Sequence, residues 1–551
     1  MKKPKSKLLT QVISRFRVAN YLNQHPEENL SSLAEKKENA ISRKEFISKM
    51  GKIGLYTATI GGIPLLTNCN DNNGKTGKSA NKGAVIAIIG GGISGLNCAY
   101  QFMKNGFDAT IYEGSFRVGG RVLTHYGDAL ENGVHPEFGG MFIDTAHEEM
   151  HRLVKEFGLE TFNLLEESNE KGLVYETFHF EGKHFTEKEI IREFKKIAPL
   201  LDKDANSLGE NYDTEDARRL DYIPLSTYIA DLQCAQWLKD ILTVAFLAEY
   251  GLETEDQSTL NMLSMLNTKP EDDFELYGES DEIYRIKGGC SLLTKAMKEK
   301  LGDRILTEYA LTKISNQGKQ YQLSFKDKPD VLADYVVLTL PFTKLREVEL
   351  DLKELTPEKK KAINEMGYGQ NNKIVLGYKS QAWREDGNKF QGNMYNNAVT
   401  NGLDASDVKK EDNPAGNYLL YLGGDESLRL ANLAVKAPQA PPNHVWKTTL
   451  PESEINKYVD ELDKIFPKSK EKFNNKHVFA CWSSYPWVYG SYTCFKPGQW
   501  TEIMPFVDIP MGNIHFAGEH CSIPWQGFMN GGAETGRLSA EKIMALIKEN
   551  G

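Results

Sequence analysis

The glycine-rich run at residues 90–95 constrains the fold more than any other feature of the sequence. The apolar segment before it, residues 84–89, predicts a buried parallel strand, and residues 94–105 after it predict a helix. The glycines match the G-x-G-x-x-G pattern, which joins a strand to a helix through a tight turn. The sequence therefore predicts an α/β domain that binds the pyrophosphate of a dinucleotide at the N-terminus of this helix.

The residues of this loop have separate expected roles. Gly90 allows the tight turn, Gly92 lets the backbone approach the pyrophosphate, and Gly95 lets the helix pack closely on the sheet. Ile93 and Ser94 lie at the start of the helix, where the backbone amides and the positive end of the helix dipole point at the phosphates. We expect all five residues in a cofactor-binding site.

A second strand is predicted at residues 108–112, and an acidic residue, Glu113, follows it. The carboxylate of Glu113 can accept hydrogen bonds from both ribose hydroxyls of a bound dinucleotide. In the next loop, Arg121 can neutralise the pyrophosphate, while Gly119 and Gly120 leave room for a large cofactor. The strand–loop–helix–strand unit alone leaves both a nicotinamide and a flavin dinucleotide open.

Length and composition limit the class of protein. The chain has 551 residues, enough for two or three domains, and its net charge of −10 argues against a general nucleic-acid binder. No run is long and apolar enough for a membrane-spanning helix. The seven cysteines form no C-x-x-C pair and no cluster with zinc-ligand spacing, so no metal site is expected.

Residues 1–82 resemble a bacterial export signal followed by a flexible tether. A basic start leads to Ser-Arg-Lys-Glu-Phe-Ile at residues 42–47, which resembles the twin-arginine motif with lysine in the second arginine position. An apolar run, residues 50–66, then leads to Cys69, the expected lipid acceptor. The expected location is the periplasm or a membrane to which lipidated Cys69 tethers the protein. A cytoplasmic protein with a disordered tail is the alternative.

Five separated motifs resemble those of the flavin-dependent amine oxidase family, which includes monoamine oxidases, polyamine oxidases and L-amino-acid oxidases. In chain order they are Glu113-x-x-x-Arg117-x-Gly119-Gly120-Arg121, residues 137–143, Gly288-Gly289 before a predicted helix, Gly369-x-x-x-Lys373 on a predicted strand, and residues 516–520 with 527–533. The resemblance extends from about residue 84 to the C-terminus and favours FAD over a nicotinamide cofactor.

The resemblance implies an α/β fold: a Rossmann-like FAD-binding domain of the Gly-Gly-Arg flavoprotein type, interleaved with an α+β substrate domain. The expected FAD-binding domain is discontinuous and consists of residues 83–165, 283–345 and 478–551. The expected substrate domain consists of residues 166–282 and 346–477. Further patterns predict helices at 187–200, 226–250 and 533–548, and strand structure at 304–314.

The resemblance also implies cofactor contacts along the chain. Gly139 and Gly140 are expected to let the backbone lie against the flavin, with Met141 and Phe142 near its ring. Leu311 falls where the family packs an apolar residue against adenine.

Further expected contacts lie near the C-terminus. Glu519 resembles the acid that meets the ribityl–pyrophosphate region of FAD. Phe528 and Met529 lie just before the final helix, whose N-terminus can favour the electron-rich edge of the reduced flavin. Ser491 stands where mitochondrial monoamine oxidases carry the cysteine that links the flavin, so the FAD is expected to be non-covalent.

Three residues are expected to carry the chemistry. In the family, a lysine at the position of Lys373 holds a water against N5 of the flavin. Tyr492 and Phe528 fall where the family places two aromatic faces around the substrate amine, which would orient it and exclude water. The tyrosine of the family is replaced by Phe528 here, so one hydroxyl is missing.

The implied reaction is hydride transfer from the carbon that bears the nitrogen to FAD. The imine is then hydrolysed, and O2 reoxidises the flavin to give hydrogen peroxide. Amino-acid oxidases of the family commonly carry a carboxylate-binding arginine at the position of Phe142. This departure favours a simple amine as substrate and leaves an L-amino acid, with Arg285 as the pairing arginine, as the alternative.

Two readings from other classes stay open. One is a flavin desaturase of the protoporphyrinogen oxidase or carotenoid type, and the other is a non-enzymatic nucleotide-binding lipoprotein. For the oligomeric state, a homodimer is an open expectation.

Overall fold

The computed structural model describes residues 83–265, 281–406, 412–435, 446–447 and 450–550, and every structural statement below concerns these residues. The expected export signal, Cys69 and the tether, residues 1–82, all lie outside them. The division of the chain into two domains stays a prediction.

A five-stranded parallel sheet contains the strand predicted before the glycine run. Across the sheet, the strands follow in the order β19 (Ile514–Phe516), β11 (Tyr335–Leu338), β1 (Ile86–Ile89), β2 (Thr110–Glu113) and β7 (Ile305–Thr307). Every residue of β1 is buried, as expected for a parallel strand that is covered on both faces. The sheet confirms the predicted α/β class.

Several helices share an apolar core with this sheet, among them the helix after the glycine run and the last helix. Helix α3 (Ile93–Lys104) follows the glycine run and contacts the last helix, α19 (Met529–Asn550). The predicted start of the last helix at residue 533 is too late. The glycines before that position serve close packing rather than a loop, because a Cβ atom on Gly531 would lie 2.1 Å from the carbonyl oxygen of Trp525.

A four-stranded sheet follows the parallel sheet in the chain. Its strands are β10 (Lys328–Ala333), β9 (Gln320–Phe325), β8 (Leu311–Gln317) and β12 (Glu349–Asp351). The strand structure predicted at residues 304–314 is wrong as one element, since β7 belongs to the parallel sheet and β8 to the smaller one. Between them, Glu308 has a φ of 63°, a left-handed conformation that interrupts a strand.

An eight-stranded sheet forms the other large layer. Its strands follow in the order β17 (Trp446–Lys447), β18 (Phe473–Ala480), β13 (Asn372–Tyr378), β16 (Gly416–Leu422), β15 (Thr400–Asp404), β14 (Phe390–Asn396), β4 (Val174–Phe180) and β5 (Lys183–His184). Neighbouring strands are antiparallel except β14 and β4, which pair in parallel.

The alternation of side chains along β13 decides where its lysine points. Ile374 packs into a core with helix α16 (Glu452–Ile465), whereas Val375 packs into a different core that contains Met141. Because side chains alternate between the two faces of a strand, Lys373 shares the face of Val375. The strand register therefore directs Lys373 towards the loop that carries Met141.

A group of helices lies between β5 and β6. They are α6 (Glu187–Phe194), α7 (Ala198–Asn206), α8 (Glu215–Asp221), α9 (Leu225–Asp231), α10 (Gln236–Tyr250) and α11 (Leu260–Leu263). The two helices predicted at 187–200 and 226–250 are each divided in two. Pro199 lies in the first turn of α7, where a missing N–H is tolerated, so a new helix starts there.

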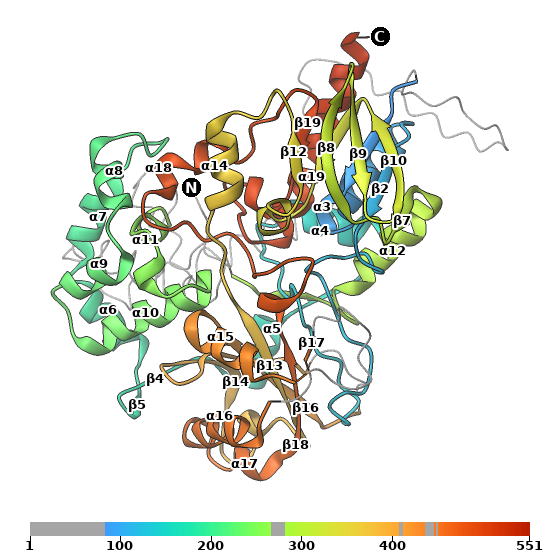
Figure 1. Cartoon of the computed structure of the whole chain (residues 1–551). Coiled ribbons are helices and arrows are strands. Elements are labelled where there is room, and N and C mark those ends of the chain that lie inside the picture. The colour runs from blue at the N-terminus through green and yellow to red at the C-terminus, as the bar shows by residue number, and fades with distance from the viewer. Residues whose placement is uncertain (1–82, 266–280, 407–411, 436–445, 448–449, 551) are drawn as a thin grey trace, which may run out of the picture.

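The remaining α-helices and strands lie between these segments in the chain. They are α4 (Glu148–Glu156), α5 (Leu164–Lys171), α12 (Ser291–Leu301), α13 (Phe342–Leu345), α14 (Pro357–Glu365), α15 (Gly424–Leu433), α17 (Ser469–Lys472), α18 (Gln499–Glu502) and the strand pair β3 (Thr161–Asn163) with β6 (Tyr284–Ile286). In Figure 1, α6–α11 gather on the left, β13, β16 and β18 lie at the bottom, and β2, β8 and β19 lie at the upper right. Within the described ranges, no helix has the length and apolarity needed to cross a membrane.

Candidate functional site

One cavity brings together residues from both large sheets. It has a volume of about 540 Å³ and lies among the glycine loops after β1 and β2, strands β13 and β16, and the N-terminus of α19. The predicted site residues that line it are Gly90, Gly92, Ile93, Ser94, Glu113, Gly120, Arg121, Gly139, Gly140, Met141, Phe142, Leu311, Lys373, Tyr492, Glu519, Phe528 and Met529. The structure thus gathers these positions, while their individual roles stay predictions.

Two glycine loops form the floor of the cavity at the dinucleotide end. The backbone N–H of Gly119 donates to the carbonyl of Gly91 at 2.8 Å, and a Cβ atom on Gly120 would lie 3.1 Å from Cα of Gly92. The bare backbone at this point is a cradle that side chains would fill. It fits the pyrophosphate of a dinucleotide lying across the start of α3.

Gly95 is the one predicted cofactor residue that does not line the cavity. A Cβ atom on Gly95 would lie 2.0 Å from the carbonyl oxygen of Gly90, so α3 approaches the preceding turn too closely for any side chain. This geometry agrees with the predicted packing role of Gly95 and not with direct contact to a cofactor.

Glu113 holds the loop with both carboxylate oxygens. Oε2 accepts a hydrogen bond from the backbone N–H of Gly91 at 2.6 Å, and Oε1 accepts one from Ser115 at 2.8 Å. A carboxylate oxygen has two acceptor positions, so these bonds leave capacity for ribose hydroxyls. Glu113 therefore shapes the loop and also fits the predicted contact with a ribose.

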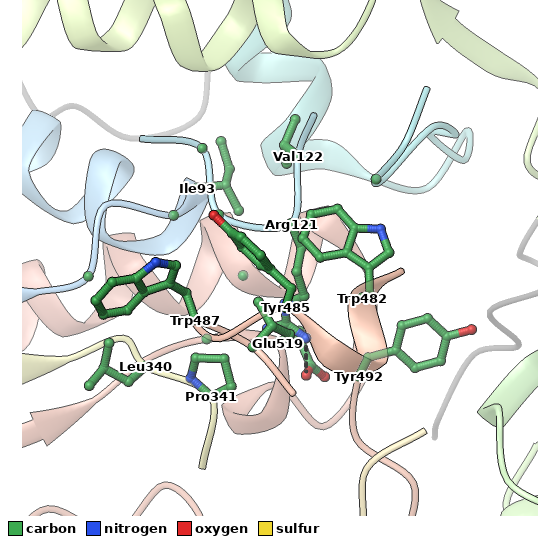
Figure 2. Close-up of a pocket in the computed structure, with 18 of the residues that line it drawn as sticks. Ile93, Arg121, Val122, Leu340, Pro341, Trp482, Tyr485, Trp487, Tyr492 and Glu519 are labelled. Carbon is green, nitrogen blue, oxygen red and sulfur yellow. Dashed lines mark hydrogen bonds and ion pairs between the residues drawn. The ribbon is translucent and has the colours of Figure 1, made fainter. Parts of the chain in front are cut away.

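Arg121 and Glu519 form an ion pair in the middle of the cavity wall. Nη1 of Arg121 donates to Oε1 of Glu519 at 2.9 Å and to the carbonyl of Ser491 at 2.7 Å. Oε2 of Glu519 accepts a hydrogen bond from the backbone of Gly527 at 2.8 Å. Figure 2 shows this pair between Trp487 on one side and Tyr492 on the other. Nη1 of Arg121 is thus engaged in hydrogen bonds within the protein. The other N–H donors of its guanidinium can bind a phosphate.

The wall expected against the flavin is made of closely packed backbone. A Cβ atom on Gly139 would lie 1.9 Å from the carbonyl oxygen of Arg121, and one on Gly140 would lie 2.7 Å from the sulfur of Met529. Neither position tolerates a side chain without movement. Flat backbone of this kind fits a planar ring system that lies against it.

Lys373 reaches this wall from β13. Its Nζ donates to the carbonyl of Gly139 at 2.6 Å and to the carbonyl of Glu137 at 3.3 Å, and it lies 5.7 Å from the centre of the Tyr421 ring. Burial lowers the pKa of Lys373, because the charged form loses its hydration. An ammonium group has three donors, so one stays available for a water or a ligand in the cavity.

The two expected aromatic faces have different partners. The hydroxyl of Tyr421 donates to the hydroxyl of Tyr492 at 2.8 Å, and the latter donates to the carbonyl of Ala248 at 3.4 Å. Burial raises the pKa of Tyr492 well above its usual value, so its phenol stays neutral. Phe528 meets His147 edge to face, with ring centres 4.8 Å apart.

Several lining residues have no counterpart in the sequence analysis, among them Tyr421, Glu282 and Asn371. The apolar pattern of β16 could have pointed to Tyr421, because the side chain of Tyr421 alternates with buried leucines. Glu282 carries no local signal at all, since it is one acid in an irregular segment. Its φ of 45° is visible in the structure alone.

Arg285 and the cysteines lie outside the cavity wall. The guanidinium of Arg285 lies 4.5 Å from the centre of the Phe142 ring, and its Nη2 donates to the carbonyl of Asp404. Phe142 lines the cavity and Arg285 does not, nor does any described cysteine. Ser491 does line it, and its hydroxyl donates to Asn371 at 2.7 Å.

Comparisons with known proteins give the family of this site. Residues 93–544 match the family described as flavin containing amine oxidoreductase. A flavin-containing amine oxidase of Danio rerio is 23% identical over 488 residues, covering 84% of this chain and 86% of the relative. An L-amino-acid oxidase of Echis ocellatus is 24% identical over 485 residues, covering 83% of this chain and 88% of the relative.

A solved structure shows the same fold. The cyclohexylamine oxidase from Brevibacterium oxydans IH-35A superposes with a TM-score of 0.68 at 20% sequence identity. The match covers 84% of this chain and 99% of that one.

Proposed function

The chain belongs to the flavin containing amine oxidoreductase family, and we propose that it oxidises a simple amine with O2 as the electron acceptor. Membership makes the protein an FAD-dependent oxidoreductase of amines or amino acids. The observation that carries the narrower proposal is that the glycine floor, Lys373 and the aromatic residues line the same cavity.

The residues of the dinucleotide end would hold FAD without a covalent bond. The cradle of Gly92 and Gly120, the carboxylate of Glu113 and the donors of Arg121 fit its ribose and pyrophosphate. No thiol lines the described cavity, and Ser491 cannot form a thioether. When bound, FAD would accept a hydride from the carbon next to the nitrogen and pass the electrons to O2, which gives hydrogen peroxide.

The residues of the amine end would bind and orient the substrate. Tyr492 and Phe528 present aromatic rings to the cavity, which exclude water and favour one orientation of the amine. Lys373 would hold a water through its remaining donor, beside the backbone wall of Gly139. A water held there would be able to exchange protons and to hydrolyse an imine product.

The charges of the cavity favour an amine over an amino acid. Among the described residues, the arginines that line it are Arg117 and Arg121. Arg117 donates to the carbonyl of Gly120 and Arg121 pairs with Glu519, so both lie at the dinucleotide end. Arg285 is separated from the cavity by Phe142. Among the described residues, the cavity wall therefore offers a substrate carboxylate no guanidinium beyond these two.

The test is to add substrates to the full-length protein without oxygen and to follow the visible absorbance of its flavin. Bleaching by 1-aminopentane and not by L-leucine is the expected result. Bleaching by L-leucine alone would replace the proposal with an L-amino-acid oxidase. Bleaching by neither would leave a desaturase or a nucleotide-binding protein.

We further propose that the protein is exported and tethered through Cys69. The support is the order of basic, apolar and cysteine-containing segments in residues 1–82. In a bacterial host, the parent protein should fractionate with membranes and Cys69→Ala should not. An unchanged distribution of Cys69→Ala would remove the lipid anchor from the account.

A further inference from the structure

One tryptophan in the cavity wall has an indole N–H without an acceptor in the protein. Nε1 of Trp487 is buried, and it donates to no acceptor among the described residues. By contrast, Trp383, Trp482 and Trp500 each donate the indole N–H to an acceptor in the protein, at 2.6–3.0 Å. Since a buried N–H without an acceptor costs free energy, a ligand that brings an acceptor to Trp487 would be favoured.

Trp487 lies at the dinucleotide end of the cavity. A Cβ atom on Gly114, the residue after Glu113, would lie 2.4 Å from Cζ3 of Trp487, so the indole packs directly on the loop after β2. These three residues all line the cavity. Figure 2 shows the indole on one side of the Arg121–Glu519 ion pair. The indole therefore stands beside the groups that fit the ribose and the pyrophosphate of FAD.

The chemistry of this end selects the acceptor for the indole. An indole N–H is a donor only, so its partner has to supply a lone pair. The nearby carboxylates are already engaged, since Glu113 accepts from two backbone N–H groups and Glu519 accepts from Arg121. A pyrophosphate brings charged oxygens, which form the stronger, charge-assisted kind of hydrogen bond. A phosphate oxygen therefore fits Trp487 better than a neutral ribose hydroxyl.

Helix α13 contacts the segment that carries Trp487 at two points. Oγ1 of Thr343 donates to the carbonyl of Val488. Nζ of Lys344 lies 5.2 Å from the centre of the Trp487 ring and 5.3 Å from the centre of the Tyr489 ring. An ammonium group is attracted to aromatic rings at such distances, so Lys344 restrains the indole against the cavity.

We propose that Trp487 is a cofactor-binding residue whose indole N–H donates a hydrogen bond to the pyrophosphate of FAD, and that Lys344 positions the indole for this bond. The proposal rests on the non-covalent FAD of the proposed function and names a contact that retains it. It does not depend on whether the substrate is an amine or an amino acid. No covalent bond changes in this contact.

The experiment measures the rate constant for release of FAD when the full-length holoprotein is diluted, read from the fluorescence of free flavin. Trp487→Phe removes the donor and keeps an aromatic ring. This variant should release FAD about 10- to 100-fold faster, the value of a lost hydrogen bond to a charged group. The matched control is Trp237→Phe, which should release FAD at the parent rate, because Trp237 stacks on Phe185 outside the cavity wall.

Trp487→His keeps a ring N–H donor on a smaller ring. At pH 8, where a histidine is neutral, it should release FAD more slowly than Trp487→Phe does. This variant also keeps the proposal testable if Trp487→Phe loses its FAD during purification.

Lys344→Met tests the positioning role. It should speed release of FAD by about 2- to 10-fold in the parent protein, the value of a cation–π contact. In the Trp487→Phe background its effect should be less than about twofold, because no indole N–H is left to position. Equal effects in the two backgrounds would overturn the positioning role and would mean that Lys344 acts on the cofactor by itself.

Release of FAD from Trp487→Phe at the parent rate would overturn the proposal, as would equally fast release from Trp487→Phe and Trp487→His. Either result would leave the proposed amine oxidation intact, since reduction by 1-aminopentane tests it separately. Precipitation of the parent protein with acid should release its flavin. Flavin that stays with the precipitate would refute non-covalent FAD, and this inference would fail with it.

Discussion

The two ends of the cavity are built in different ways. At the dinucleotide end, Gly92, Glu113 and Arg121 lie close together in the sequence. They belong to one strand–helix–strand unit or to the loop directly after it. At the amine end, the wall is assembled from positions as distant as Glu282 and Phe528. The first end depends on glycine backbone, and the second depends on side chains that distant elements bring together. Substitutions should therefore affect cofactor binding at one end and rates at the other.

The largest expected effect is loss of the cofactor on filling the glycine cradle. Gly92→Ala adds a Cβ atom whose nearest neighbour is 4.0 Å away, so the FAD-free protein should keep its stability to within about 1 kcal/mol. The same Cβ atom occupies space expected for the pyrophosphate, and the purified variant should be colourless. Flavin absorbance and thermal unfolding measure the two properties.

Gly139→Ala is the comparison for that variant. Its Cβ atom would lie 1.9 Å from the carbonyl oxygen of Arg121, so the backbone itself has to move. Both stability and FAD content should fall. If the purified Gly92→Ala variant is yellow, it still binds flavin, and the cofactor does not lie across the glycine loop at Gly92.

A smaller effect is expected at the amine end. Lys373→Met should retain FAD and slow the reactions of the flavin with amine or with O2 by about 100-fold, the usual contribution of a positioned proton-handling group. Stopped-flow absorbance measures both steps. Lys359→Met is the matched control, because Lys359 is also buried but lies outside the cavity wall. Unchanged rates in Lys373→Met would refute its predicted role.

Tyr492→Phe should have a milder effect. The change removes the hydroxyl that accepts from Tyr421 and leaves the aromatic face in place. One hydrogen bond is worth about 0.5–1.5 kcal/mol, so KM for the amine should rise by about 2- to 10-fold with little change in kcat. A large fall in kcat would mean that the hydroxyl takes part in the chemistry.

The smallest effect concerns the pH dependence of stability through Lys359. Its Nζ donates to the carbonyls of Phe506 and Val507, and burial lowers its pKa to about 8. The unfolded chain keeps this proton up to about pH 10.5, so above pH 8 it binds more protons than the folded protein. This group therefore makes the protein more stable as pH rises from about 8 to 10.5, by about 1 kcal/mol per pH unit.

The measurement is the midpoint of thermal unfolding at pH 8 and at pH 9. The parent protein should gain stability relative to Lys359→Met between these values. A constant difference between the two proteins would contradict the lowered pKa.

The contrast between the two ends of the cavity also explains how much of the structure the sequence predicts. The glycine floor was predictable because the pattern demands close backbone approach within one local unit, and residues 84–121 contain all of it. Lys373 was predictable through resemblance, and the register of β13 directs it into the cavity. The break at Glu308 was not predictable, because a left-handed residue other than glycine leaves no clear mark in a sequence.

The missed residues share a physical reason. Tyr421 and Glu282 reach the cavity through sheet pairing and through the buried Asp144–His147 pair, which are long-range contacts. A single sequence carries no local pattern for such contacts. Arg285, by contrast, was named from the sequence, and the structure places its guanidinium 4.5 Å from the centre of the Phe142 ring.

The most direct test of the central claim, that one cavity holds FAD and an amine together, is the visible absorbance of the full-length protein on mixing with an amine without oxygen. The account predicts that the flavin band disappears at a rate that saturates with amine concentration, while FAD stays with the protein. A protein that carries FAD and keeps its full flavin band with every amine tested would contradict it.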